Sequence, residues 1–166
     1  FQYSALNESF FKNVYRLLPG HQFVYRDGHA EFSAFNHFSF APQPMPLKER
    51  AAQIRQVVAE SVKAHEISDV EVGAFLSGGI DSSVITALSR PDKTYSVGFA
   101  NKGFDETSEA KALCDELGLR NLSKTITPEE FFSALPAIQY YADEPNANLS
   151  TVPLYFLSQL AARDVK

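Results

Sequence analysis

Cysteine is almost missing from this chain: Cys114 is its single cysteine among 166 residues. One cysteine excludes an internal disulfide and a cysteine-based zinc cluster, and it is typical of a reducing compartment. The chain also lacks any run of about 18 apolar residues and any basic stretch ahead of an apolar one, so neither a membrane span nor a signal peptide is predicted. We therefore expect a cytoplasmic protein without a membrane partner.

Positive charge is scarce as well, since 15 Lys and Arg stand against 20 Asp and Glu, for a formal net charge of −5. The basic residues are scattered, which argues against a surface for nucleic-acid phosphates. A nucleotide ligand stays open, because local backbone N–H groups or a bound cation can hold phosphate in an acidic protein. The start at Phe1, together with the close at Lys166 directly after a helical pattern, suggests a segment of a longer protein.

The first part of the chain predicts a hairpin and a linker. Segments 21–26 and 29–35 alternate apolar and polar residues around Asp27-Gly28, a pair that supplies the positive φ angles of a tight turn. Residues 41–46 are rich in proline, which removes backbone donors and disfavours helix in the preceding residue. We interpret that stretch as a linker.

From Leu47 to about His65 the pattern is that of a helix, with one apolar stripe formed by Leu47, Ala51, Ile54, Val58 and Val62. Strands are then predicted at 70–76, 94–99 and 121–126, in alternation with helices at 82–90, 105–117, 128–142 and 153–163. Thr127 and Thr151 are the expected N-caps of the last two helices. Strands that alternate with helices predict an α/β fold: a partial doubly wound parallel sheet, preceded by the β-hairpin.

A loop of glycine and serine follows the first predicted parallel strand, at residues 77–83. Ligands of parallel sheets bind beyond the carboxyl ends of the strands. Gly78 and Gly79 permit positive φ angles and close approach of a ligand, so that successive N–H groups can converge on phosphate oxygens. The helix expected from about Ser82 points its positive end at the same place. The loop therefore predicts a phosphate site.

Asp81 would repel a phosphate unless a divalent cation lay between them, and this predicts Mg²⁺, a hard ion that prefers oxygen ligands. The loop has no lysine of the GxxxxGK[ST] type, which excludes the kinase and GTPase classes that use a Walker loop. A plain strand-to-helix turn, in which Asp81 or Ser82 caps the helix, is the structural alternative.

The string SGGIDSS resembles the pyrophosphate loop of ATP pyrophosphatases, and FLSGGIDSSVITAL resembles the glutamine-hydrolysing asparagine synthetase family. Stretches 95–99, 103–119 and 143–161 resemble its second strand, the following loop and helix, and a later substrate-side loop and helix. Residues 7–35 resemble the end of its glutaminase domain. The resemblance runs almost end to end and is most specific in the loop.

This resemblance implies an ATP-dependent ligase. The side-chain carboxylate of aspartate attacks the α-phosphate of ATP, pyrophosphate leaves, and ammonia from glutamine displaces AMP to give asparagine. Leu76 and Val97, at the ends of adjacent strands, would bracket the adenine, and Asp81 would bind the metal. The pyrophosphate would be held by the loop, whose residues are Ser77, Gly78, Gly79, Ile80, Asp81, Ser82 and Ser83.

The resemblance also implies a division of the chain. Residues 1–40 would be the end of the glutaminase domain, 41–46 a linker, and 47–166 the N-terminal part of the synthetase domain. The nucleophilic cysteine of the glutaminase and a second acidic metal-binding loop would lie outside these residues. We therefore assign no catalytic residue and expect the chain alone to be inactive.

Several other residues are interpreted more simply. Cys114 is expected in the core, and the four histidines, at 21, 29, 37 and 65, show no metal-ligand spacing. Asp143 and Glu144 fit a substrate-side loop and a solvated loop equally. The doubled aromatics Phe10-Phe11 and Phe131-Phe132 are expected in a core or at an interface, and their exposure would favour a homo-oligomer.

Two other functions are compatible with the sequence. One is an enzyme with the same loop and a different carboxylate acceptor, as in β-lactam synthetases. The other is a folded piece without catalysis that binds nucleotide weakly or not at all. The loop at 143–151 does not distinguish among the acceptors.

Overall fold

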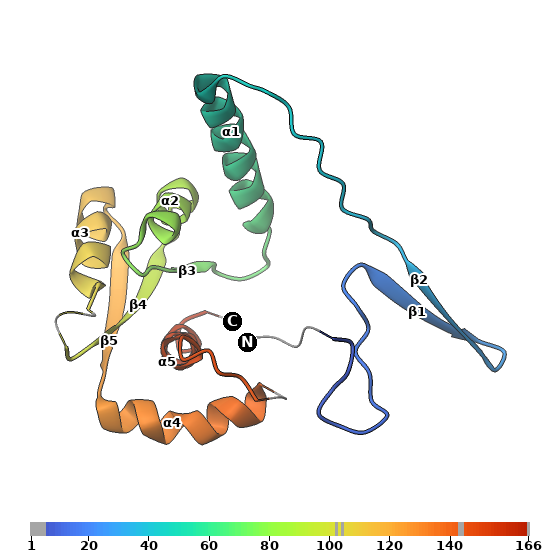
Figure 1. Cartoon of the computed structure of the whole chain (residues 1–166). Helices are drawn as coiled ribbons and strands as arrows, with labels where there is room; N and C mark the ends of the chain where they lie inside the picture. Colours follow the sequence, from blue (N-terminus) through green and yellow to red (C-terminus); the bar gives the residue numbers. More distant parts are fainter. Residues whose placement is uncertain (1–5, 102, 104, 143–144, 166) are drawn as a thin grey trace.

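The hairpin and the α/β part of the chain are separate in the computed structural model, which describes residues 6–101, 103, 105–142 and 145–165. A two-stranded sheet contains β1 and β2, and a three-stranded sheet has the order β3-β4-β5. In Figure 1 the hairpin is joined to α1 by a long extended segment and stands away from the parallel sheet. The predicted fold class, α/β with a parallel sheet after a hairpin, is confirmed.

The hairpin consists of β1 (His21–Arg26) and β2 (His29–Ala34), which pair antiparallel. Asp27 and Gly28 have φ angles of 52° and 79°, as the sequence predicts for a tight turn. The rings of Phe23 and Phe32 face each other across the strands, with centroids 5.0 Å apart, yet both remain exposed. Cross-strand pairing therefore supplies the packing of this ribbon.

Helix α1 (Leu47–His65) has the predicted bounds, but its apolar stripe is largely exposed. Leu47 and Ile54 are 83% and 57% exposed, and only Val58 and Val62 of the stripe are half-buried. The reason is that α1 contacts α2 with its C-terminal half (Figure 1). The prediction of a helix is confirmed, and only the C-terminal half of its apolar stripe is packed against the rest of the protein.

The parallel sheet is formed by β3 (Gly73–Phe75), β4 (Lys93–Phe99) and β5 (Arg120–Ile126). The pairs Phe75–Tyr95 and Tyr95–Leu122 fix the register of the three strands. The strand predicted at 70–76 is shorter than expected, because Val70 and Val72 precede the pairing with β4 and remain partly exposed.

Four helices follow these strands, and their bounds differ from the predicted ones by up to two residues at either end: α2 (Ile80–Ser89), α3 (Thr107–Leu117), α4 (Pro128–Tyr141) and α5 (Thr151–Ala161). Thr151 is not the N-cap of α5, because the helix begins at that residue and Ser150 precedes it. The Thr151 hydroxyl instead donates to the Asn148 carbonyl, at 2.7 Å. Within the described ranges, no helix combines the length and the apolar character that a bilayer crossing requires.

Helices cover both faces of the sheet, as the alternation of strands and helices predicts. On one face Leu76 packs with Ala110 and Cys114 of α3. On the other face Ile126 packs with residues of α4 and α5. Each face thus has its own apolar cluster.

The doubled aromatics divide between core and surface. Phe131 packs against the α4–α5 cluster, with its ring centroid 6.3 Å from that of Phe99. Its neighbour Phe132 is exposed, as are Phe10 and Phe11. The core alternative is therefore confirmed for Phe131, and an interface stays a prediction for the other three.

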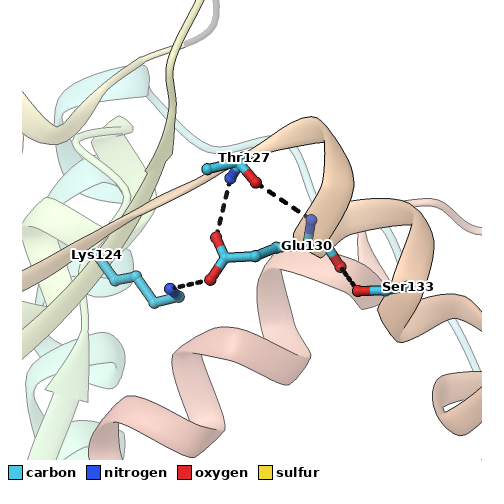
Figure 2. A network of polar contacts seen from close by, with 4 residues as sticks. All are labelled: Lys124, Thr127, Glu130 and Ser133. Atoms are coloured by element: carbon cyan, nitrogen blue, oxygen red, sulfur yellow. Dashed lines mark hydrogen bonds and ion pairs between the residues drawn. The ribbon is translucent and has the colours of Figure 1, made fainter.

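The start of α4 is a complete capping box, shown in Figure 2. The Glu130 N–H donates to the Thr127 hydroxyl at 3.2 Å, and the Thr127 N–H donates to the Glu130 carboxylate at 3.0 Å. Lys124 of β5 adds an ion pair with Glu130 at 2.6 Å. The Lys124 hydrogen bond, together with the Thr127 backbone, holds the pKa of Glu130 below its ordinary value. The predicted N-cap at Thr127 is confirmed.

Candidate functional site

The predicted loop lies at the carboxyl end of β3, where the chain turns into α2 (Figure 1). Ser77, Gly78 and Gly79 form the turn, and Ile80 is the first residue of the helix, with Gly79 as its N-cap. The helix therefore starts two residues before the predicted Ser82. Neither Asp81 nor Ser82 is the N-cap of the helix. The alternative of a turn in which one of these two residues caps the helix is therefore wrong.

The two glycines have different roles. Gly78 has a φ of +81°, in the left-handed region that favours glycine, whereas Gly79 has an ordinary φ of −68°. A Cβ at Gly78 would lie 2.8 Å from the Glu106 carbonyl oxygen and 3.0 Å from Cβ of Glu109. The start of α3 therefore requires glycine at 78. At Gly79 a Cβ would meet only Ser77 Oγ, at 3.4 Å, so this side of the loop is open to close approach by a ligand.

Serine hydroxyls hold the turn together. Ser82 Oγ accepts a hydrogen bond from the Ser77 N–H at 3.3 Å and donates to the Gly79 carbonyl at 3.1 Å. The two hydroxyls of Ser77 and Ser82 lie 3.0 Å apart. The loop thus keeps its shape through its own side chains, and both hydroxyls lie at the turn itself.

The first turn of α2 presents backbone donors and one carboxylate. No side chain caps the helix, and the Ser83 N–H is the first in the helix to bond back, to the Gly79 carbonyl at 3.0 Å. In an α-helix the N–H groups of the first turn have no acceptor within the helix. Asp81 lies in this turn, is exposed, and forms no hydrogen bond or ion pair with any described residue. Its carboxylate is available to a cation.

A cavity of about 520 Å³ borders the loop on the sheet side. It brings together four predicted residues, Leu76, Ser77, Ser82 and Val97. The glycines, Ile80, Asp81 and Ser83 do not line it, and Ile80 is 83% exposed. The cavity therefore lies between the loop, represented by Ser77 and Ser82, and the carboxyl ends of β3 and β4. The rest of the first turn of α2 lies at the edge of this cavity.

Leu76 and Val97 reach this cavity from opposite faces of the sheet. The Leu76 side chain is 1% exposed and packs with Ala110 and Cys114 on the α3 face. Val97 packs against the α4–α5 cluster on the other face. Adenine bracketing by these two residues stays a prediction, because their side chains lie on opposite faces of the sheet.

The sequence did not indicate three other residues of the cavity, Phe75, Glu106 and Ser150. Phe75 ends β3, Glu106 precedes α3, and Ser150 precedes α5. Phe75 lies within the strand predicted at 70–76, and its position next to the loop was the available signal. Glu106 and Ser150 lie within stretches 103–119 and 143–161, which resemble the family, but the sequence did not single out either residue, and the tertiary fold brings them to the cavity.

A second cavity of about 840 Å³ adjoins the first and shares Phe99, Ser150 and Pro153 with it. It lies beyond the ends of β4 and β5, and its walls are mainly apolar, with Phe131 and Phe132 of α4 among them. Asp143 and Glu144, which fit a substrate-side or a solvated role equally by sequence, lie outside the described residues. The site thus has a polar loop on one side and an apolar recess beside it.

The residues expected to be non-catalytic show ordinary contacts. Cys114 is buried in the core, as predicted. The Nδ1 atoms of His21, His29 and His65 each lie within 3.0 Å of a backbone carbonyl near in sequence. In the part of the chain that the structure describes, no three His, Cys, Asp or Glu side chains gather as a metal site.

The profile of the asparagine synthase family matches residues 53–166, which include the loop, the three parallel strands and helices α2 to α5. The chain belongs to the asparagine synthase family. It is 40% identical over 158 residues to asparagine synthetase [glutamine-hydrolyzing] 1 of Bacillus subtilis, covering 92% of this chain and 25% of that protein. It is 42% identical over 121 residues to a putative asparagine synthetase [glutamine-hydrolyzing] of Mycobacterium tuberculosis, covering 70% of this chain and 19% of that protein. The chain thus spans about a quarter of the length of these relatives or less.

Among solved structures, an NH3-dependent NAD synthetase from Campylobacter jejuni matches with a TM-score of 0.37 and 23% identity, over 73% of this chain and 54% of that one. An NMN synthetase from Francisella tularensis matches with a TM-score of 0.40 and 18% identity, over 73% of this chain and 52% of that one.

Proposed function

We propose that this chain supplies the ATP-binding loop of an ATP-dependent amidotransferase that makes asparagine. The observation that carries the proposal is the start of α2: a ten-residue helix without a side-chain cap, entered through Ser77-Gly78-Gly79 beside a cavity at the carboxyl edge of the sheet. Oriented N–H groups at such a place favour an anion. Because the chain belongs to the asparagine synthase family, we infer that the anion bound at this helix start is the pyrophosphate part of ATP.

In the proposed reaction, an oxygen of the aspartate side-chain carboxylate attacks the α-phosphorus of ATP, and the bond to the β-phosphate oxygen breaks. Pyrophosphate leaves and an aspartyl adenylate remains, which ammonia from glutamine then converts to asparagine and AMP. Negative charge grows on the leaving pyrophosphate, so donors fixed in advance around it lower the barrier. The relatives named as glutamine-hydrolysing asparagine synthetases support this choice of acceptor and ammonia source.

The residues of the loop fit both the phosphate and a magnesium ion. The open side of Gly79 admits close approach, and the hydroxyls of Ser77 and Ser82 border the cavity. The Asp81 carboxylate is exposed beside these donors, and oxygen ligands of this kind suit Mg²⁺. When bound, the ion would neutralise part of the pyrophosphate charge.

The remaining assignments belong to the same proposal. Leu76 and Val97 would flank the adenine, and residues 1–40, 41–46 and 47–166 would be the glutaminase end, the linker and the synthetase part. The enzyme would act in the cytoplasm on ATP, aspartate and glutamine, without nucleic acid or membrane. Catalysis would need residues beyond this chain, including a second acidic metal-binding loop.

The test is pyrophosphate release by the intact protein that carries this chain. Aspartate should be required for release from Mg-ATP, and the Asp81→Ala variant should be inactive. Release that requires a different carboxylic acid would overturn the asparagine assignment while keeping the adenylating loop. No release with any carboxylate, together with no binding of Mg-ATP, would overturn the ATP assignment itself.

A further inference from the structure

Two hydroxyl side chains are fully buried within the central strand of the sheet. Thr94 and Ser96 of β4 are 0% and 1% exposed, and both point to the face that α3 covers, since Thr94 contacts Cys114 there. A buried hydroxyl costs free energy unless it is hydrogen-bonded. Their partners therefore decide what these two residues contribute.

Each of these two hydroxyls donates a hydrogen bond to a backbone carbonyl. Ser96 Oγ donates to the Leu76 carbonyl at 2.7 Å, and Thr94 Oγ1 donates to the Arg120 carbonyl at 3.3 Å. Each hydroxyl has a single proton, so a hydroxyl that donates to its carbonyl can only accept from other groups. Thr94 Oγ1 also lies 3.2 Å from Cys114 Sγ, where either atom can be the donor. One donor is common to both hydroxyls. That donor is the amide of Asn121 on β5, whose Nδ2 lies 2.9 Å from Thr94 Oγ1 and 3.0 Å from Ser96 Oγ.

The two branches of this network end at different places. The Thr94 branch returns to β5, at the residue next to Asn121. The Ser96 branch crosses to Leu76, the residue directly before the loop. The Leu76 N–H is held by the Tyr95 carbonyl at 2.9 Å, and its side chain is buried. With Ser96 on its carbonyl, the last residue before Ser77 is fixed at both ends of its backbone.

We propose that Ser96 and Asn121 are positioning residues of the loop: a hydrogen-bonded relay from β5 through β4 fixes the Leu76 carbonyl and so sets where the loop begins. The relay extends the attachment of β3 to β4 by one residue beyond the regular strand, which ends at Phe75. Its importance for ATP rests on the proposed function. Thr94 lies in the same strand and provides a control, because its hydroxyl donates to the Arg120 carbonyl and forms no hydrogen bond that leads to the loop.

The first experiment measures Mg-ATP binding and thermal unfolding of Ser96→Ala and Thr94→Val. Both variants lose a buried hydroxyl and leave former partners unsatisfied, so both lower the melting temperature. Ser96→Ala should weaken Mg-ATP binding about tenfold, since loss of one such bond is commonly of that size. Thr94→Val should change binding less than about twofold, and Ser96→Thr, which keeps the hydroxyl, should bind more tightly than Ser96→Ala.

The second experiment needs no nucleotide. Amide chemical shifts and exchange rates of residues 77–83 are compared in the full 166-residue chain. Ser96→Ala should shift these amides and accelerate their exchange, whereas Thr94→Val should not. The relay is overturned if the loop amides are unchanged in Ser96→Ala, or if both variants alter them equally. If the loop responds as expected but the intact wild-type protein that carries this chain fails to bind Mg-ATP, the relay stands and the proposed function fails.

Discussion

Two helices begin at the same edge of the parallel sheet, and their starts are built in different ways. After β5, helix α4 is capped by its own side chains: Thr127 and Glu130 exchange hydrogen bonds, and Lys124 balances the carboxylate (Figure 2). After β3, helix α2 has no side-chain cap, and its first-turn carboxylate, on Asp81, pairs with no described residue.

The difference in capping implies different roles for the two helix starts: that of α4 contributes to stability, and that of α2 to ligand binding. A capping box satisfies donors that would otherwise need water, and so it stabilises the helix. A start without a cap leaves donors for an anion from outside, and the helix dipole favours that anion. We therefore expect substitutions at α4 to change the free energy of unfolding and substitutions at α2 to change binding of Mg-ATP.

The largest effect is expected for Gly78→Ala. The residue would need a φ of +81°, and its Cβ would lie 2.8 Å from the Glu106 carbonyl oxygen. The loop must therefore move, and binding of Mg-ATP, measured by calorimetry, should fall by a factor of roughly 5 to 100, by analogy with other strained backbone sites that cost roughly 1–3 kcal/mol.

Gly79→Ala is the matched control for the backbone of the loop. Its φ of −68° suits any residue, and its new Cβ would meet only Ser77 Oγ at 3.4 Å. The melting temperature should fall clearly in Gly78→Ala and change little in Gly79→Ala. Equal losses of stability in the two variants would contradict the packing of Gly78 against α3.

The next effect is expected for Asp81→Ala. Mg²⁺ should raise the affinity of the wild-type chain for ATP, and this gain should be absent in the variant because the carboxylate that holds the ion is gone. Titrations with and without Mg²⁺ measure the gain directly. Asp69→Ala removes another exposed carboxylate, away from the loop, and should keep the full gain. A magnesium gain that persists in Asp81→Ala would show that the ion is held elsewhere.

A smaller effect is expected at the other helix start. Thr127→Ala removes the hydroxyl that accepts the Glu130 N–H, and loss of an N-cap costs about 0.5–2 kcal/mol of unfolding free energy. Denaturant unfolding measures it, and Mg-ATP affinity should stay the same. Ser150→Ala is the control for stability, because Ser150 precedes α5 without forming a side-chain cap bond. The contrast between the two starts fails if Thr127→Ala leaves stability intact.

The smallest effect is a pH dependence at Glu130. Its pKa in the folded chain is lowered below the ordinary 4.5 by the Lys124 hydrogen bond and by the Thr127 backbone. The ionised carboxylate therefore contributes stability that is present above pH 4.5 and is lost as the pH falls through the lowered pKa.

Unfolding of the wild type and Glu130→Gln should be compared from neutral pH down through this range. The difference in stability should shrink as the solution becomes acidic. Glu129→Gln, an equal change of charge at an exposed neighbour, serves as the control for the loss of one negative charge. A difference between wild type and Glu130→Gln that grows toward acid would have the wrong sign for this interaction.

Local chemistry made much of this fold predictable. The turn at Asp27-Gly28, the cap at Thr127 and the strand-to-helix turn after β3 each depend on a few neighbouring residues. The alternation of strands and helices was enough for a parallel sheet covered on both faces. These features are fixed by backbone angles, by capping and by periodicity, all of which the sequence carries directly.

What the sequence did not predict depends on contacts across the fold. The sequence explains Gly78 by the close approach of a ligand. The structure adds a second reason, because a side chain at this position would collide with the start of α3. The stripe on α1 predicted burial, but no packing partner covers its first half among the described residues. The Ser96–Asn121 relay joins strands that are separated along the chain, and no local pattern marks such a bond.

The most direct test of the central claim is an NMR titration of the chain with millimolar Mg-ATP, with amide shifts followed at the starts of both α2 and α4. We predict that amides of residues 77–83 shift with saturation, that Asp81→Ala loses the magnesium-dependent part, and that the amides of Glu129 and Glu130 at the capped start of α4 stay in place. The account is contradicted if the loop amides do not shift, or if those of α4 shift in their stead.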